Sequence, residues 1–168
     1  MSETQVDTAD RFRRVLCGVL AAVEGPDNTV LFVHQERGPF GGNWLLPGGG
    51  IELGESAEDA VIREVSEEAG IEITEPRLFA VYEITGEWND HVYHFVLLGF
   101  KAKTTGVIPA EFKGHNVHGA RLVRTGELPL HSTDLRILTD AGIAMFGEQE
   151  IEDALARDNI RMKSYRTQ

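Results

Sequence analysis

The chain has 168 residues, of which 42% are hydrophobic and 26% charged, a composition typical of a globular domain with one sizeable core. Its formal net charge of −11 argues against binding to nucleic acid, because such binding needs cations that replace the phosphate counterions. Cys17 is the only cysteine, so we expect no internal disulfide and a reducing, cytoplasmic compartment. Residues 1–12 lack the pattern of a signal peptide, and no apolar run reaches membrane-spanning length, so we expect no membrane partner.

The first structured part of the chain is predicted to be a hairpin. Residues 1–11 are polar, and we expect them to be flexible. The apolar runs 15–23 and 29–35 predict two strands joined by the turn 24–28 (EGPDN). Cys17 lies in the first strand and is interpreted as a small core residue rather than a reactive thiol.

A loop over residues 38–43 (GPFGGN) leads to a glycine-rich segment. Arg37 and Phe40 stand just before that segment and are candidate substrate-binding residues. Arg37 has two interpretations, contact with a phosphate group or exposure to solvent at a strand end. Trp44 is interpreted as a packing residue beneath the loop.

The segment 47–71 (PGGGIELGESAEDAVIREVSEEAGI) predicts a glycine-rich loop followed by a helix. Ser56 and Asp59 fit the pattern of a helix N-terminus, and Gly70 fits a left-handed helix end. An apolar stripe that can pack on a sheet is formed by Val61, Ile62, Val65 and Ala69.

Three carboxylates share one face of this helix, because Glu64, Glu67 and Glu68 stand at i, i+3 and i+4. One interpretation is a solvated acidic face, in which each adjacent pair costs roughly 0.2–0.5 kcal/mol. The other is a site for Mg²⁺ or Mn²⁺, hard cations that prefer oxygen ligands. The run Gly48–Gly50 (GGG) favours the second, since glycine suits a backbone that turns sharply or approaches a ligand closely.

Residues 77–85 and 91–101 predict two strands joined by the loop 86–90, which presents Trp88 as a candidate substrate contact. The polar stretch 104–118 is long enough to be a functional loop, and it contains Glu111, His115 and His118. A zinc site at the two histidines lacks two further ligands.

The C-terminal part predicts a short strand over 120–123 and two helices. The first helix begins at residues 132–134 (STD) and runs to about Phe146, and the second covers 148–157. Residues 161–168 are basic and predicted to be flexible. With no repeat or linker, we expect residues 1–168 to form a single domain.

Gly49, Glu55 and the run 63–71 (REVSEEAGI) resemble the Nudix box in every defined position. The resemblance implies a Nudix fold of the α/β class, an α/β/α sandwich with a mixed central sheet. It also implies a metal-dependent hydrolase that cleaves the phosphoric anhydride of a nucleoside diphosphate linked to another moiety.

The same resemblance implies roles for individual residues. Glu64, Glu67 and Glu68 correspond to metal ligands, and the Gly48 carbonyl to a further ligand. Arg63 corresponds to a residue that orients a glutamate. Glu55 resembles a supporting carboxylate that hydrogen-bonds within the box.

The general base stays open between Glu64, Glu111 and His115, in that order of preference. The substrate stays open as well, with nucleoside triphosphates and other nucleotide derivatives as the default. Gly86 and Glu87 stand where ADP-ribose hydrolases of the family often have a proline.

Two further expectations concern how the chain acts. A homodimer is expected from the tendency of the family and from surplus apolar surface. The alternative function is a non-catalytic Nudix-like nucleotide sensor, although such domains often have an eroded box.

Overall fold

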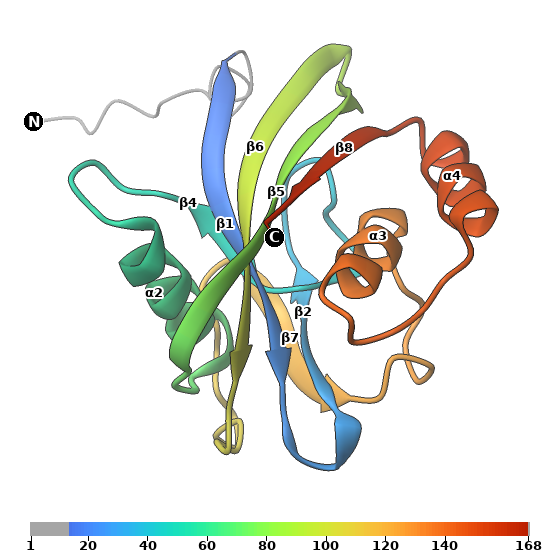
Figure 1. The fold of residues 1–168 in the computed structure, drawn as a ribbon. Helices are drawn as coiled ribbons and strands as arrows, with labels where there is room; N and C mark the ends of the chain where they lie inside the picture. The colour runs from blue at the N-terminus through green and yellow to red at the C-terminus, as the bar shows by residue number, and fades with distance from the viewer. Residues whose placement is uncertain (1–13, 168) are drawn as a thin grey trace, which may run out of the picture.

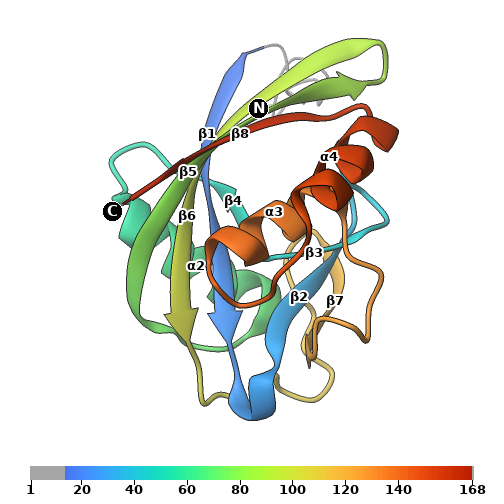
Figure 2. The same cartoon turned by 45° about the vertical axis from the view of Figure 1, so that its right-hand side comes forward.

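The computed structural model describes residues 14–167, so the segment 1–11, which the sequence predicts to be flexible, lies outside the described residues. In the described part, eight strands form one mixed sheet with the order β3-β2-β1-β6-β5-β8, while β4 pairs with β1 and β7 with β2. Helix α2 covers one face of the sheet, and helices α3 and α4 cover the other (Figures 1 and 2). The predicted α/β/α sandwich is confirmed.

Strand β1 (Val15–Glu24) lies at the centre of the sheet. It runs parallel to β6 (His91–Lys103) along its whole length and antiparallel to the short strand β4 (Gly48–Gly50). The hairpin predicted between β1 and β2 (Val30–Gln35) exists only next to its turn, where Glu24 pairs with Val30. The segment 48–50 was predicted as a loop, but its backbone pairs with β1.

Side chains of β1 alternate between two hydrophobic cores, as the period of two in a strand requires. Val19, Ala21 and Val23 are buried against α2 (Ala57–Ala69). Leu20 and Ala22 are buried on the other face, in the core under α3 (Ser132–Asp140) and α4 (Glu148–Arg157). Burial on both faces explains the apolar run over residues 18–23. Val15 and Cys17 are exposed, so the interpretation of Cys17 as a core residue is wrong.

Strands β5 (Thr74–Trp88) and β6 form a hairpin that is longer than predicted, with only Asn89 and Asp90 in its turn. Both turn residues have positive φ, 49° and 62°, as a two-residue turn of type I′ requires. Trp88 was expected at a loop tip, but it ends β5, and its ring packs partly buried against the core under α3 and α4.

The helix α2 begins and ends as predicted. The Ser56 hydroxyl accepts from the Asp59 amide at 3.0 Å, and Gly70 closes the helix at φ 66°. Ile62 departs from the predicted apolar stripe and is 38% exposed. Helix α4 has its predicted bounds, whereas α3 ends at Asp140 rather than near Phe146, because Gly142 takes φ 66° after the C-cap.

The prediction that residues 161–168 are flexible is wrong for most of this segment. Residues Arg161–Arg166 form β8, which pairs antiparallel with β5 at the edge of the sheet, and Met162 packs against the core. The remaining short strands are β3 (Trp44–Leu45) and β7 (Val117–Val123). Among the described residues, no helix is both long and apolar enough to cross a membrane.

Hydrogen–deuterium exchange checks the assignment of β8. We expect about half of the amides of 161–166 to be protected, because an edge strand pairs on one side only. Amides of the loop 105–110, which has no regular secondary structure, serve as the unprotected reference in the same experiment. Equally fast exchange in both segments would show that the C-terminal residues are flexible after all.

Candidate active site

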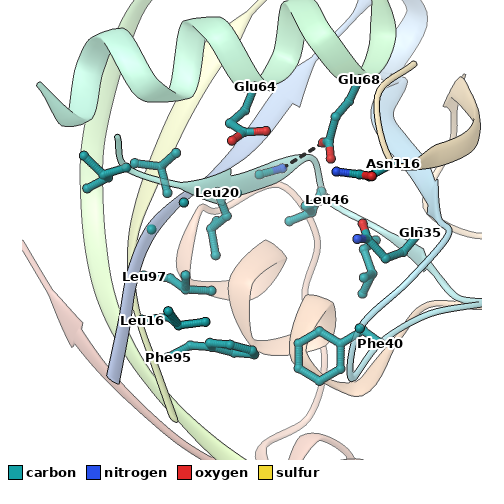
Figure 3. A pocket seen from close by; sticks show the side chains of 18 of the residues that line it. Leu16, Leu20, Gln35, Phe40, Leu46, Glu64, Glu68, Phe95, Leu97 and Asn116 are labelled. Carbon is teal, nitrogen blue, oxygen red and sulfur yellow. Dashed lines mark hydrogen bonds between the residues drawn. The ribbon is translucent and has the colours of Figure 1, made fainter. Parts of the chain in front are cut away.

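A cavity of about 620 Å³ lies beside the C-terminal half of α2 and extends towards α3. Its polar wall is formed by the acidic face of α2, with Glu64 and Glu68 on the side of β4 (Figure 3). Phe40 and Phe95 lie at the opposite end. The cavity therefore joins a charged end to an aromatic end.

The guanidinium group of Arg63 organises the charged end. It donates to both oxygens of Glu55, at 2.8 and 3.0 Å, and to the Gly50 carbonyl at 3.0 Å. It also donates to Glu64 at 3.0 Å and to Glu67 at 3.3 Å. The hydrogen bonds that Arg63 donates to Glu55 lower the pKa of Glu55 and raise the pKa of Arg63. The arginine thus ties the segment before the helix to the acidic face.

Glu68 is set apart from this network because its side chain is buried, with only 4% exposed. Its Oε2 accepts a hydrogen bond from the Gly48 amide at 3.0 Å. Burial raises its pKa to about 8, and repulsion from Glu64 and Glu67 adds to the shift. Burial also raises the pKa of Glu64. Ionising Glu68 is therefore unfavourable unless a cation compensates its charge.

The glycines of β4 permit a close approach between the strand and the two elements around it. A Cβ atom at Gly48 would overlap the Val19 carbonyl, and one at Gly49 would overlap the Glu64 carboxylate. Glycine is thus required here by neighbouring atoms rather than by a positive φ. The close approach of β4 to α2 allows the Gly48 amide to donate a hydrogen bond to the Glu68 carboxylate.

The loop between β6 and β7 brings His115 to the acidic face, but not Glu111. The His115 amide donates to the Glu67 carbonyl at 2.9 Å, and its Nδ1 lies 3.8 Å from Glu67 Oε2. His115 lines the cavity. Glu111 is exposed and lies outside the cavity wall, as does His118, which stacks near His34 with ring centroids 5.5 Å apart.

Of the candidate substrate-binding residues, Arg37 and Phe40 line the cavity and Trp88 does not. The Arg37 side chain is 72% exposed, so it can reach a ligand at the cavity mouth. The Phe40 ring packs edge-on against Tyr93 and Phe95 at centroid distances of 5.6 and 6.0 Å. Both residues lie on the segment between β2 and β3.

The sequence analysis did not predict that α3 forms part of the cavity wall. Thr133 and Asp134 in its first turn line the cavity, although residues 132–134 were interpreted only as a helix start. His131 is the actual N-cap, and its ring accepts from the Thr133 amide. The available signal was the polar triplet in front of an apolar helix, which local rules assign to capping.

The carboxylates suit a divalent cation in their chemistry, although they do not surround a single point as they stand. Within residues 14–167, no three His, Cys, Asp or Glu groups are close enough together to hold a metal ion. Arg63 holds Glu64 and Glu67, while Glu68 bonds the Gly48 amide. The three carboxylates nonetheless offer oxygen donors, and the buried one, Glu68, has no cationic partner among the described contacts, which fits Mg²⁺ or Mn²⁺.

The comparison with protein families gives one extended match. A model described as the NUDIX domain matches residues 15–141. This region runs from β1 to the C-cap of α3 and includes all residues of the acidic face.

Curated relatives include 8-oxo-dGDP phosphatase NUDT18 of Danio rerio, 32% identical over 139 residues, which are 83% of this chain and 42% of that protein. ADP-ribose pyrophosphatase of Methanocaldococcus jannaschii is 42% identical over 64 residues, which are 36% of this chain and 38% of that protein. This chain therefore spans less than half the length of either relative.

Solved structures show the same fold. The MutT NUDIX hydrolase from Burkholderia pseudomallei superposes with a TM-score of 0.61 at 26% identity, covering 74% of this chain and 96% of that one. The NUDIX domain of Shewanella oneidensis NrtR, complexed with ADP ribose, has a TM-score of 0.61 at 21% identity, covering 84% and 97%.

Replacement of Glu68 by Gln should stabilise the metal-free protein, and more so at high pH. The folded chain keeps a proton on Glu68 up to its pKa of about 8, whereas the unfolded chain loses it near 4.5. Stability conferred by the neutral form is therefore lost as the pH rises through this window. Glutamine has no proton to lose and still accepts from Gly48.

We expect the melting temperature of Glu68→Gln in chelator to exceed that of the parent by about 2–8 °C at pH 8, and by less at pH 5. Glu58→Gln, at an exposed position of the same helix, is the control and should show no such pH trend. A gain that does not change with pH would refute the assigned ionisation.

Proposed function

Because the NUDIX model spans residues 15–141, this chain belongs to the Nudix family, and we propose that it is a metal-dependent hydrolase of nucleotide derivatives. Its substrate class would be a nucleoside diphosphate linked to another moiety, cleaved at the phosphoric anhydride. The observation that carries the proposal is the cavity, which joins three carboxylates, one of them buried and without a cationic partner, to an aromatic end. We also propose that residues 1–168 act as a single Nudix domain.

Nudix hydrolases generally use divalent metal ions. We propose Mg²⁺, with Mn²⁺ as a substitute, held by Glu64, Glu67 and Glu68, with the Gly48 carbonyl as a further ligand. Such an ion, when bound, supplies charge neutralisation for the diphosphate and activation of a water molecule. Its positive charge also favours the ionised form of Glu68, which burial otherwise opposes.

The residues of the chain divide the remaining work. Arg63 orients Glu64 and Glu67 through its hydrogen bonds to both carboxylates. The proton of the attacking water would pass to Glu64 or to His115, since both line the cavity. We keep Glu64 as the first candidate, and the position of Glu111 outside the cavity removes support for that residue.

The two ends of the cavity suggest how a nucleotide would lie in it. The diphosphate would occupy the charged end, where Arg37 at the mouth can offset phosphate charge. The base would occupy the aromatic end beside Phe40 and Phe95. Purine nucleoside di- and triphosphates are the first substrates to test, because the Danio rerio relative is named an 8-oxo-dGDP phosphatase. ADP-ribose is the second, from the archaeal relative.

Substitution of the acidic face tests the catalytic assignment. We expect Glu64→Gln and Glu68→Gln to lower kcat/KM by about 10²–10⁴ at saturating metal, because each removes a charged ligand while preserving shape. Asp59→Asn is the control and should keep the parental rate, since asparagine can still accept from Ser56. Melting curves exclude misfolding. Three equal rates would mean that the acidic face is only a scaffold.

Metal dependence is tested separately, with a panel of nucleotides and detection of released phosphate and nucleotide. Chelator should abolish hydrolysis, and added Mg²⁺ or Mn²⁺ should restore it. Full activity in excess chelator would contradict the proposal. Nucleotide binding without any hydrolysis would favour the alternative, a nucleotide sensor. Homodimerisation stays a prediction that a mass measurement in solution can decide.

A further inference from the structure

A second cavity, of about 250 Å³, lies outside the proposed active site. It is lined by residues of β2, β3 and β7, namely His34, Trp44, His118, Gly119, Ala120 and Arg121. His34 pairs with Trp44 on β3 and with Gly119 on β7. Neighbouring side chains of a strand point to opposite faces, and Gln35 and Leu45, the next residues along β2 and β3, line the active-site cavity. The second cavity therefore lies on the other face of the same two strands.

One of the lining side chains, Arg121, is a permanent cation. Its Cζ lies over the Trp44 ring, 5.2 Å from the ring centroid. No ion pair of the described residues includes Arg121, and no carboxylate stands among the described residues that line the cavity. Although the chain has a net charge of −11, this exposed arginine is therefore available to bind an anion.

Two histidine rings lie beside each other in the same cavity, at a centroid distance of 5.5 Å. The pairing between β2 and β7 changes register next to His34, so His118 has no direct partner on β2, and this irregularity allows its ring to lie beside that of His34. His34 Nε2 lies 3.1 Å from the Gly42 carbonyl, which can only accept, so Nε2 is the donor and Nδ1 is left for a ligand. When protonated, an imidazole donates from both nitrogens.

The size and charge of the second cavity fit a small oxyanion. Pockets for drug-sized ligands measure about 300–1,000 Å³, so a volume of about 250 Å³ suits a phosphate group better than a whole nucleotide. A guanidinium group matches phosphate oxygens with two parallel N–H donors. A transition metal fits less well, because the cavity offers two histidines and no further ligand of this kind, and Arg121 adds positive charge.

We propose that Arg121, His34 and His118 bind the phosphate group of a small ligand in the second cavity. The inference goes beyond the proposed function and does not depend on it, since none of these three residues lines the active-site cavity. The Trp44 ring holds the guanidinium in place through the cation–π contact. The guanidinium and the two imidazoles then donate to the phosphate oxygens.

The test is a titration of the chain with inorganic phosphate, followed by NMR of the tryptophan indole N–H signals at about pH 6, where imidazole commonly carries a proton. Chelator keeps metal ions out of the active site, and added chloride holds the ionic strength constant. The chain has two tryptophans, so Trp88, which does not line the second cavity, is the internal reference. We expect the Trp44 signal to shift with half-saturation at about 1 mM and the Trp88 signal to stay. Trp44→Phe assigns the signals.

Arg121→Gln should weaken phosphate binding by at least about 10-fold, because it removes a charged pair of donors. His118→Gln should weaken it by about 3–10-fold. Arg124→Gln is the matched control, because it removes the same charge from an exposed position just after β7, and it should keep the parental affinity within about twofold. Arg121→Lys keeps a cation near Trp44 without the planar fork and should bind with intermediate affinity. Melting curves exclude misfolding.

Adenosine 5′-monophosphate is titrated in parallel to identify the source of the phosphate group. Similar affinity for both ligands would support the proposal with a phosphate monoester as the ligand, and binding of inorganic phosphate alone would support it with the free ion. A Trp44 signal that does not shift, or that shifts no more than the Trp88 signal, would overturn the proposal. So would equal affinities of Arg121→Gln and Arg124→Gln.

Discussion

The guanidinium group of Arg63 is the interaction on which the acidic face depends. Glu64 and Glu67 would repel each other on adjacent turns of an exposed helix, but one cation hydrogen-bonds both of them. The same group makes two bonds to Glu55, which precedes the helix, and one to the Gly50 carbonyl. A planar fork with several donors can serve these partners together, whereas a lysine could not.

Glu68, unlike Glu64 and Glu67, is not bonded to Arg63. Its carboxylate lies beyond the reach of Arg63 in the described contacts and inside the fold, where a backbone amide is its polar partner. The protein therefore holds a group whose charge is unfavourable in the chain alone. The charges of Glu64 and Glu67 are compensated by Arg63 of the same chain. The charge of Glu68 can be compensated by a bound cation.

Much of the fold follows from local rules. Ser56 and Gly70 set the ends of α2, and the bounds of α4 follow from its apolar spacing. The elements that local rules miss depend on distant partners. Residues 161–166 form a strand because β5 offers a free edge, and β4 is a strand because its glycines allow β1 to approach.

The site divides in the same way. Helical periodicity places Glu64, Glu67 and Glu68 on one face of the helix, and in the structure all three line the cavity. The spacing within the loop 104–118 does not tell Glu111 from His115, since that choice depends on how the loop packs on α2. Asp134 was missed because burial is a property of the assembled layers, not of the triplet in which it stands.

The parallel pairing of β1 with β6 also has a consequence for the order of folding. The partners Leu16 and Phe95 are far apart in the chain, so their pairing closes a long loop, with its cost in chain entropy. The β5–β6 hairpin closes through two residues that adopt the turn conformation locally. The hairpin can therefore form early and offer β1 a template. Since β4 pairs with β1, we expect the hydrogen bond between the Gly48 amide and Glu68 to form after the central strand is in place.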